Sequence, residues 1–255
     1  RTRPAVRQLM SAIKKFVQWN RCICRQVSHI FPRAFSGDNY IEDLLLIIEA
    51  AIRTKQPKTI LEAGGVDRPL LKKGNGFKFI GVDIEKRDGC DHLYDQFIVQ
   101  SVEDAMPVAV DMIISITLME HVPDNRRAAA SIFQSLNPSG STYHYIPSGL
   151  HPYSISLRLV GPAIQKFLIP ILRPGAEAVT GYPAFFNYCT PKAMGNLFKD
   201  AGFTDVKVKP YYRANDYFAF FVPAYIFISL FENLCKAFGW RIFASGFIIS
   251  AERSR

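Results

Sequence analysis

Two carboxylates stand at the ends of apolar runs in the first half of the chain. Glu62 closes one run and is followed by Ala63 and the pair Gly64 and Gly65, and Asp83 closes the next run twenty-one residues after Glu62. Glycine lets a backbone approach a ligand closely. A carboxylate at the end of the second strand of an α/β sheet can accept hydrogen bonds from the two hydroxyls of a ribose. The spacing therefore predicts a site for a nucleotide-like cofactor, although either acid alone could be a cap or a turn residue.

The elements that must position these residues alternate between strand and helix. Apolar runs predict strands at residues 59–63, 77–82, 97–100, 111–116, 141–146, 206–211 and 242–251. Helical periodicity predicts helices over 40–51, 125–136 and 190–201. A further helix is expected directly after Gly65, where its first N–H groups would face a ligand. The pattern predicts a doubly wound α/β sheet buried on both faces.

The N-terminal segment differs from the rest of the chain. Residues 5–31 place apolar side chains at helical steps with cationic residues opposite, which predicts an amphipathic helix within a basic segment 1–36. Residues 37–255 are predicted to form the main domain. The helix is expected to lie on an anionic membrane surface or, alternatively, to cap the domain with its apolar face.

Two later segments are expected to be additions to the sheet. Residues 148–189 are rich in proline, glycine and aromatic residues, which predicts a folded lid insertion with a helix over 154–168. Residues 217–238 predict a helix that is apolar on nearly every side and contains Pro223. Such a helix has to be covered by protein, lipid or a hydrophobic substrate. Together with residues 5–31 it suggests a peripheral membrane protein on the cytoplasmic face of a membrane.

Charge and cysteine content exclude several classes of protein. The net charge is +9, but eight basic residues fall within the first 36 positions, and the remaining chain is close to neutral. A near-neutral body offers no phosphate track, so no nucleic-acid partner is expected. The five cysteines are scattered without the paired spacing of a zinc site, which favours a reducing compartment and predicts no metal.

Three motifs resemble one enzyme family. Residues 111–124, DMIISITLMEHVPD, resemble the fourth-strand motif of the class I S-adenosylmethionine-dependent methyltransferases, especially the group similar to ubiquinone-biosynthesis enzymes. Residues 136–140, LNPSG, resemble the turn before their fifth strand, and residues 190–203, ending in AGF, resemble the helix and turn before their sixth. The resemblance covers residues 40–251. It implies a seven-stranded sheet with the last strand antiparallel to six parallel ones, and S-adenosylmethionine as cofactor.

The resemblance also implies roles for individual residues. Glu62 and Gly64 are expected to face the methionine moiety, within the turn formed by Ala63 and Gly65, and Asp83 is expected to bind the ribose. The remaining cofactor-binding candidates are Ile84 and Val102 at the adenine faces, Ser101 at the usual adenine-contact position, and Ser115, Ile116 and Thr117 on the far side of the methionine.

Methyl transfer from a sulfonium is an in-line displacement that depends mainly on holding the reacting atoms in line. A hydroxyl acceptor would in addition require a general base, and histidine suits this role near neutral pH. His151, just beyond the fifth predicted strand, is the first candidate, and His121, after the fourth, is the second, with a capping or packing role as its alternative. His144 lies within a predicted strand and is expected to pack in the core.

The lid and the apolar helix resemble a subgroup of methyltransferases found with bacterial polysaccharide and lipid-carrier pathways. That resemblance implies O-methylation of a small-molecule, glycan or lipid-linked acceptor at the membrane surface.

Two other functions compete with methyl transfer. A nicotinamide-dependent oxidoreductase would share the ribose carboxylate, but the first turn lacks G-x-G-x-x-G. The family usually shows E/D-x-G-x-G-x-G, whereas residues 62–68 read EAGGVDR and keep only Gly64 at its place. This departure leaves a non-catalytic methyltransferase-fold scaffold as the alternative.

Overall fold

The computed structural model describes residues 4–37, 39–173 and 183–254. Residues 174–182 of the predicted lid, and Arg1 and Arg3 of the basic segment, lie outside the described residues. The chain divides into two compact units. The sheet unit comprises residues 39–149, 184–210 and 246–255, and the helical unit comprises residues 1–38, 150–183 and 211–245.

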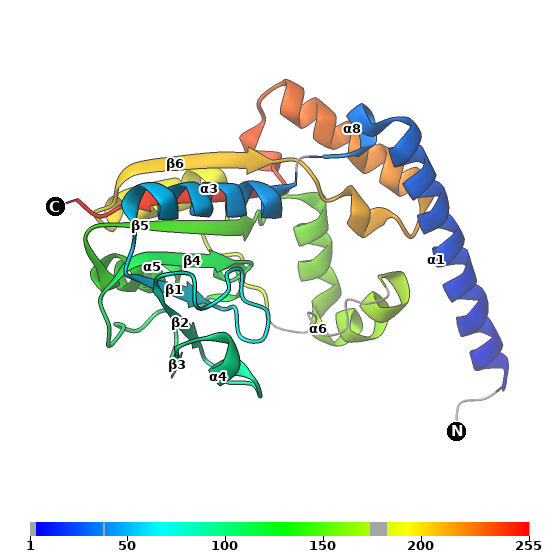
Figure 1. Cartoon of the computed structure of the whole chain (residues 1–255). Coiled ribbons are helices and arrows are strands. Elements are labelled where there is room, and N and C mark those ends of the chain that lie inside the picture. The colour runs from blue at the N-terminus through cyan, green and yellow to red at the C-terminus, as the bar shows by residue number, and fades with distance from the viewer. Residues whose placement is uncertain (1–3, 38, 174–182, 255) are drawn as a thin grey trace. The chain divides into compact units, whose positions relative to one another are not determined.

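The sheet unit is built on a seven-stranded sheet in the order β3-β2-β1-β4-β5-β7-β6 (Figure 1). The strands are β1 Thr59–Ala63, β2 Lys78–Asp83, β3 Gln96–Val99, β4 Val110–Ile116, β5 Leu136–Pro147, β6 Thr204–Tyr211 and β7 Gly246–Glu252. The pairs among β1 to β5 are parallel, and β7 is antiparallel to β5. The predicted α/β fold with an antiparallel last strand is confirmed.

The strand register brings three carboxyl ends together at one edge of the sheet. Ala63 of β1 pairs with Val82 of β2 on one side and with Ser115 of β4 on the other. The strand order reverses between β1 and β4, because chain order runs outward from this point in both directions. Open α/β sheets bind their ligands at such a reversal, beyond the carboxyl ends of the strands.

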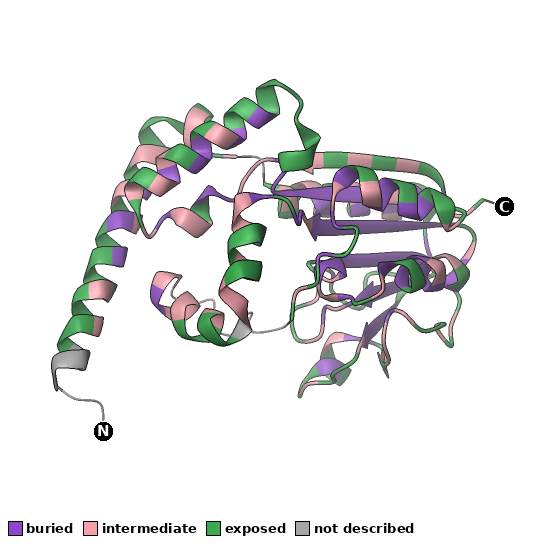
Figure 2. Ribbon diagram, turned by 180° about the vertical axis from the view of Figure 1, so that it is seen from behind, coloured by how far each residue is buried: buried purple, intermediate pink, exposed green. Residues whose placement is uncertain are grey.

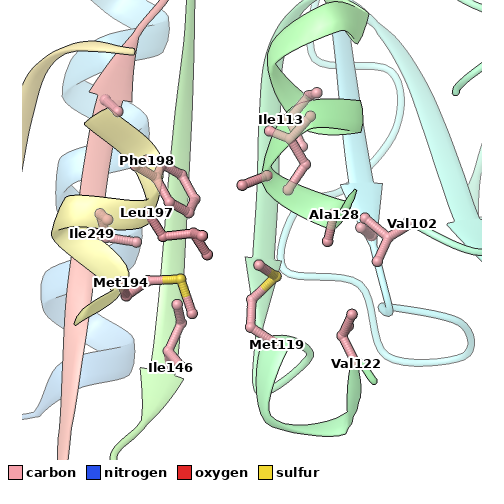
Figure 3. Packing of buried hydrophobic residues seen from close by; sticks show 14 of the residues in the cluster. Val102, Ile113, Met119, Val122, Ala128, Ile146, Met194, Leu197, Phe198 and Ile249 are labelled. Carbon is pink, nitrogen blue, oxygen red and sulfur yellow. The ribbon is translucent and has the colours of Figure 1, made fainter. Parts of the chain in front are cut away.

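Three long helices of the sheet unit are capped by side chains that accept from their first N–H groups. They are α3 Tyr40–Lys55, capped by Asn39, α5 Asn125–Ser135, capped by Asp124, and α7 Pro191–Asp200, capped by Thr190. A cap of this kind satisfies N–H groups that a helix leaves without a partner. On one face of the sheet, Met194, Leu197 and Phe198 of α7 lie beside Ile146 and Ile249 of the strands (Figure 3). The central strands β1, β4, β5 and β7 are mostly buried, whereas β3 and β6 at the two ends of the sheet are mostly exposed or half-buried (Figure 2).

The expectation of a helix after Gly65 is wrong. Within the described part of the chain, residues 64–77 form turns and bends, and no helix lies between β1 and β2. Only the four-residue α4, Cys90–Leu93, lies between β2 and β3. Gly64, Gly65, Gly74, Gly76 and Pro69 fall within this stretch, and such a density of glycine and proline opposes a helix.

The helical unit contains the N-terminal helix and the two later segments. Its elements are α1 Pro4–Ile30, α2 Pro32–Phe35, α6 Pro152–Leu172, the 3-10 turn η3 Asn215–Phe218, α8 Val222–Ala237 and the 3-10 turn η4 Arg241–Phe243. Cys24 of α1 is buried against Ala219 and Tyr225, and Asn20 accepts a 3.0 Å hydrogen bond from Val222 N. Val27, an apolar residue of the predicted amphipathic helix, packs against the same cluster, so this helix packs in part against α8 and the segment that leads into it.

Three of the later elements differ from the sequence expectation for a clear local reason. The late helix begins at Val222 instead of residue 217, because Pro223 is tolerated only in a first helical turn, where its missing N–H is not needed. The last strand begins at Gly246, since η4 occupies the first apolar residues of the predicted strand. The lid helix α6 is interrupted at Gly161, whose φ is 74°. Among the described residues, no helix is both long and apolar enough to cross a bilayer.

Candidate functional site

The carboxyl ends of β1, β2 and β4 are tied to their neighbours by backbone hydrogen bonds. Gly64 N donates to Val82 O at 2.9 Å, which joins the turn after β1 to β2. Thr117 N donates to Tyr145 O at 3.0 Å, which joins the turn after β4 to β5. The predicted residues Gly64, Asp83 and Thr117 therefore follow adjacent strands at one fixed edge.

Two non-glycine residues at this edge have left-handed backbone conformations. Val66 has φ of 45° and Thr117 has φ of 51°, close to Gly64 with φ of 81°. A β-branched residue in this region is a real outlier and costs of order 1–3 kcal/mol. Strain of this kind persists where the surrounding structure holds it, and it concentrates at functional sites. Both outliers follow strands that flank the reversal point of the sheet.

Asp83 presents a carboxylate next to an uncovered apolar side chain. Asp83 is partly exposed, and its Oδ1 accepts a 2.9 Å hydrogen bond from Glu85 N. Partial burial raises the pKa of Asp83 above its usual value. The next residue, Ile84, is 73% exposed. A carboxylate beside an open apolar surface suits a ribose with an adjoining base, as the sequence predicted for this pair.

Glu62 is turned into the protein. It is fully buried, and both carboxylate oxygens accept from Leu70 N, at 2.9 and 3.0 Å. Burial raises the pKa of Glu62 to about 8. Its hydrogen bonds hold the loop after β1 in place, so we expect Glu62 to act on a ligand through that loop. Its predicted contact with the methionine moiety stays a prediction.

Tyr94 lies under the glycine pair and was missed by the sequence reasoning. A Cβ added to Gly65 would collide with Tyr94 Oη and with Glu62 Oε1, so only glycine fits there. Tyr94 is buried, and among the described residues its hydroxyl has no hydrogen-bond partner. Nothing in the sequence links Tyr94 to Gly65, because they meet only through the pairing of strands.

The Ser115 hydroxyl also has its hydrogen-bond partner inside the protein. It is fully buried, and its Oγ lies 2.7 Å from His144 Nδ1, while Thr142 hydrogen-bonds the other ring nitrogen of His144. Burial lowers the pKa of His144 to about 3, so the ring is neutral. The expectation that His144 packs in the core is confirmed. Ile116 is partly buried and Thr117 is exposed. Of the three residues predicted on the far side of the methionine moiety, these two are therefore accessible to solvent.

Ser101 and Val102 form part of a turn after β3. Ser101 Oγ accepts from Glu103 N at 3.2 Å, and Val102 is buried in the same core cluster as Ala63 and Met119. Figure 3 shows Val102 beside Ala128 of α5. Their predicted contacts with the adenine stay predictions.

A second buried carboxyl, Glu120, follows β4. It belongs to the motif at residues 111–124, but the sequence alone assigned it no function. Its backbone oxygen accepts from Phe185 N at 2.8 Å and Phe186 N at 3.0 Å, which holds the later segment against β4. Among the described residues its Oε2 has no hydrogen-bond partner, and burial raises its pKa to about 8. Glu120 Oε1 lies 3.7 Å from Nε2 of His121, whose side chain is 36% exposed.

His151 belongs to the helical unit and is fully buried. Its Nδ1 accepts from Tyr153 N at 3.2 Å as the cap of α6, and its Nε2 lies 3.2 Å from Glu232 Oε1 of α8. Glu232 also accepts from Ala214 N. These contacts give His151 a structural role in joining α6 to α8. Its predicted role as a general base stays a prediction.

The backbone requirement at Gly64 is testable by stability. Gly64→Ala places a Cβ 3.0 Å from Leu118 Cδ1 at φ of 81°, whereas Gly74→Ala, at φ of 87°, meets nothing within 4 Å. We expect Gly74→Ala to lower the free energy of unfolding by about 1 kcal/mol from backbone strain alone, and Gly64→Ala by about 2 kcal/mol. Urea denaturation measures both, and equal losses would show that the turn has room for a side chain.

The chain matches known families and folds over most of its length. Residues 37–208 match the model of a family described as a methyltransferase domain. No curated protein sequence gives a significant match.

Solved structures share the fold at low identity. A Thermotoga maritima S-adenosylmethionine-dependent methyltransferase, described as a possible histamine N-methyltransferase, has a TM-score of 0.52 at 13% identity, covering 92% of this chain and 98% of that chain. Phosphoethanolamine N-methyltransferase 2 of Haemonchus contortus, solved with phosphomonomethylethanolamine and S-adenosylhomocysteine, has a TM-score of 0.50 at 12% identity, covering 95% and 61%. The CurJ carbon methyltransferase has a TM-score of 0.50 at 14% identity, covering 86% and 56%. The chain thus spans about three fifths of the length of the last two.

Proposed function

Because this chain belongs to the methyltransferase-domain family, we propose that it transfers a methyl group from S-adenosylmethionine, the cofactor of this family, to an acceptor hydroxyl. One observation carries the proposal. Gly64, Asp83 and Thr117 follow three adjacent strands at the reversal point of the sheet, with strained backbone on both sides of that point. The donor, when bound, supplies an electrophilic methyl group.

The residues at this edge fit such a donor. The glycine pair Gly64 and Gly65 keeps side chains away from the turn after β1, so its backbone can approach a ligand. Asp83 offers one Oδ that is not used by Glu85 N, which can accept from ribose hydroxyls. Ile84 offers an exposed apolar surface for the base. These groups would hold and orient the methyl donor, and the rate of an in-line transfer depends on that orientation.

For a hydroxyl acceptor we propose His121 as the proton-accepting group. It ends the 3-10 turn Met119–His121, shortly after β4, and is partly exposed, whereas His151 is fully buried against Glu232. A general base has to reach the proton that it removes, by direct contact or through one water. This preference reverses the order in which the sequence ranks the two histidines.

We further propose a small-molecule, glycan or lipid-linked acceptor at a membrane surface. The structural neighbours include an N-methyltransferase and a carbon methyltransferase, so the shared fold does not fix the acceptor atom. Support for a lipid-linked acceptor comes from the exposed apolar side chains of the helical unit.

A non-catalytic scaffold is the competing function. It is favoured by the turns at residues 64–77, where the described chain offers no helix N-terminus to the ligand edge. Under this alternative the fold would anchor a biosynthetic partner without binding the methyl donor.

Isothermal titration with S-adenosylmethionine and S-adenosylhomocysteine tests the proposal first. We expect micromolar binding of both, followed by transfer of a labelled methyl group to hydroxyl-bearing lipid-linked or glycan acceptors. If a protein that circular dichroism shows to be folded gives no binding heat with either compound, the scaffold function holds instead.

A further inference from the structure

The positive charge of the protein belongs to one of its two units. The helical unit contains 14 basic and 4 acidic residues, a net charge of +10, and the sheet unit contains 17 basic and 18 acidic residues, a net charge of −1. In the described part of the helical unit the acids are Asp216, which lies 3.7 Å from Arg213, and Glu232, which is buried against His151. Its exposed surface is therefore strongly cationic.

The same unit carries most of the exposed apolar side chains. Of the 24 large apolar side chains that are exposed in the described chain, 18 belong to the helical unit and 6 to the sheet unit. Single exposed apolar residues are normal on a protein surface, but a contiguous group marks an interaction site. The arrangement of these side chains on the helices therefore decides whether they mark such a site.

One group of these side chains forms a stripe along α8 and η4. Tyr225, Ile228 and Cys235 of α8 are buried. On the other side of the helix four side chains are exposed at steps of three and four residues: Phe227, Leu230, Leu234 and Phe238. At about 100° per residue these four fall within about 80° of one another, opposite the buried side. Because both sides are apolar, packing inside the protein accounts for only one of them.

Aromatic side chains extend the stripe beyond the helix. Phe238 stacks on Trp240 with ring centroids 5.3 Å apart, and Trp240 lies edge-on to Phe243 at 6.5 Å. All three rings are exposed, as is Ile242 between them. Aromatic rings next to cationic residues are typical of surfaces at the boundary between water and lipid. Here Lys236 and Arg241 supply exposed cations in the same stretch.

The N-terminal helix of the same unit shows a second exposed apolar strip. Val17, Asn20 and Cys24 are buried, whereas four apolar side chains of α1 remain exposed: Leu9, Phe16, Trp19 and Ile30. At about 100° per residue they also fall within about 80° of one another. Lys15 lies one turn before Trp19 and is exposed.

We propose that the helical unit docks on an anionic bilayer surface through the α8–η4 stripe, Phe227, Leu230, Leu234, Phe238 and Trp240. Charge complementarity selects this partner, since the unit that carries the stripe accounts for the net positive charge of the chain, while the sheet unit is nearly neutral. An apolar stripe and a cationic surface supply two signals, insertion and electrostatic attraction, and lasting membrane association requires two. The inference concerns a surface of the helical unit and is independent of the methyl-transfer proposal.

Vesicle co-sedimentation of the full chain tests the docking surface. We expect binding to phosphatidylcholine vesicles that contain phosphatidylglycerol, at least tenfold weaker binding to phosphatidylcholine alone, and loss of binding as salt screens the charge. The double variant Phe227→Ser with Phe238→Ser should bind the anionic vesicles at least tenfold more weakly. The matched control Ile41→Ser with Leu46→Ser removes two exposed apolar side chains from α3 of the sheet unit and should bind as the unaltered chain does.

Two results would overturn the docking proposal. One is equal binding by the stripe variant and the control. The other is a concentration-dependent dimer that the stripe variant abolishes, which would make a second copy the occupant of the stripe. Titration with S-adenosylmethionine on every variant keeps the two proposals apart, because we expect cofactor binding to be unchanged when docking is lost.

Discussion

Asp83→Ala should weaken S-adenosylmethionine binding by about 100-fold or more, because hydrogen bonds to a charged group contribute about 1.5–3 kcal/mol each and tenfold in affinity corresponds to about 1.4 kcal/mol. Asp83 stands at the end of β2, and its partly exposed carboxylate accepts a 2.9 Å hydrogen bond from Glu85 N, only two residues further on. The side chain therefore adds little to folding stability, and its loss should appear in binding. Isothermal titration measures the change directly.

Asp88→Ala is the matched control. Asp88 lies five positions further on in the same exposed loop and carries the same charge. We expect its replacement to change cofactor affinity less than twofold, since long-range attraction at the surface is screened by salt. Equal losses in both variants would mean that general charge, and not a ribose contact at the end of β2, drives binding; no loss in either would place the cofactor elsewhere.

The strands of the ligand edge could be predicted closely because they are continuous apolar runs. The first predicted strand, 59–63, matches β1, and β4 differs from its prediction only by one added residue, Val110. Most positions of both strands are buried and most are apolar, so the ends of the apolar run lie close to the ends of the strand. The predicted position of Asp83 followed from the same signal.

Predictions failed where apolar residues lie on the surface and not in a buried strand. Ile242 and Phe243 read as the start of the last strand but are exposed in η4, so their hydrophobicity reflects a surface. The missing helix after β1 could be anticipated only by giving the glycines and Pro69 more weight than the family pattern. Local composition outweighed the resemblance there.

The interior contacts of the site depended on strand register, which no local pattern encodes. Ser115 and His144 are partners in the β4–β5 pairing, and this register brings the Ser115 hydroxyl within 2.7 Å of the imidazole Nδ1. A one-residue shift of register would send each side chain to the other face. The sequence identified Ser115 as a site residue by position but could not show which way it points.

Glu120→Gln should change how stability depends on pH. Burial raises the pKa of Glu120 from 4.5 to about 8, so the folded protein keeps this carboxyl protonated while the unfolded chain ionises it. The stability that this group contributes is fully present below pH 4.5 and is lost as pH rises towards 8, at about 1.4 kcal/mol per pH unit. Glutamine cannot ionise and removes this slope.

The difference in unfolding free energy between Glu120→Gln and the unaltered chain should therefore move in favour of the variant by about 3 kcal/mol between roughly pH 5 and pH 7.5. Any fixed cost of burying the amide is the same at each pH and does not alter this difference. Glu62, which has a similarly raised pKa, is present in both proteins, so its contribution to the difference cancels.

Urea denaturation across the pH range measures this difference in unfolding free energy. Glu49→Gln, on the exposed side of α3, is the control, and we expect its difference from the unaltered chain to stay constant with pH. A variant that loses stability with pH as steeply as the unaltered chain would show that Glu120 is already ionised in the fold, with His121, whose Nε2 lies 3.7 Å from Glu120 Oε1, as the partner to test next.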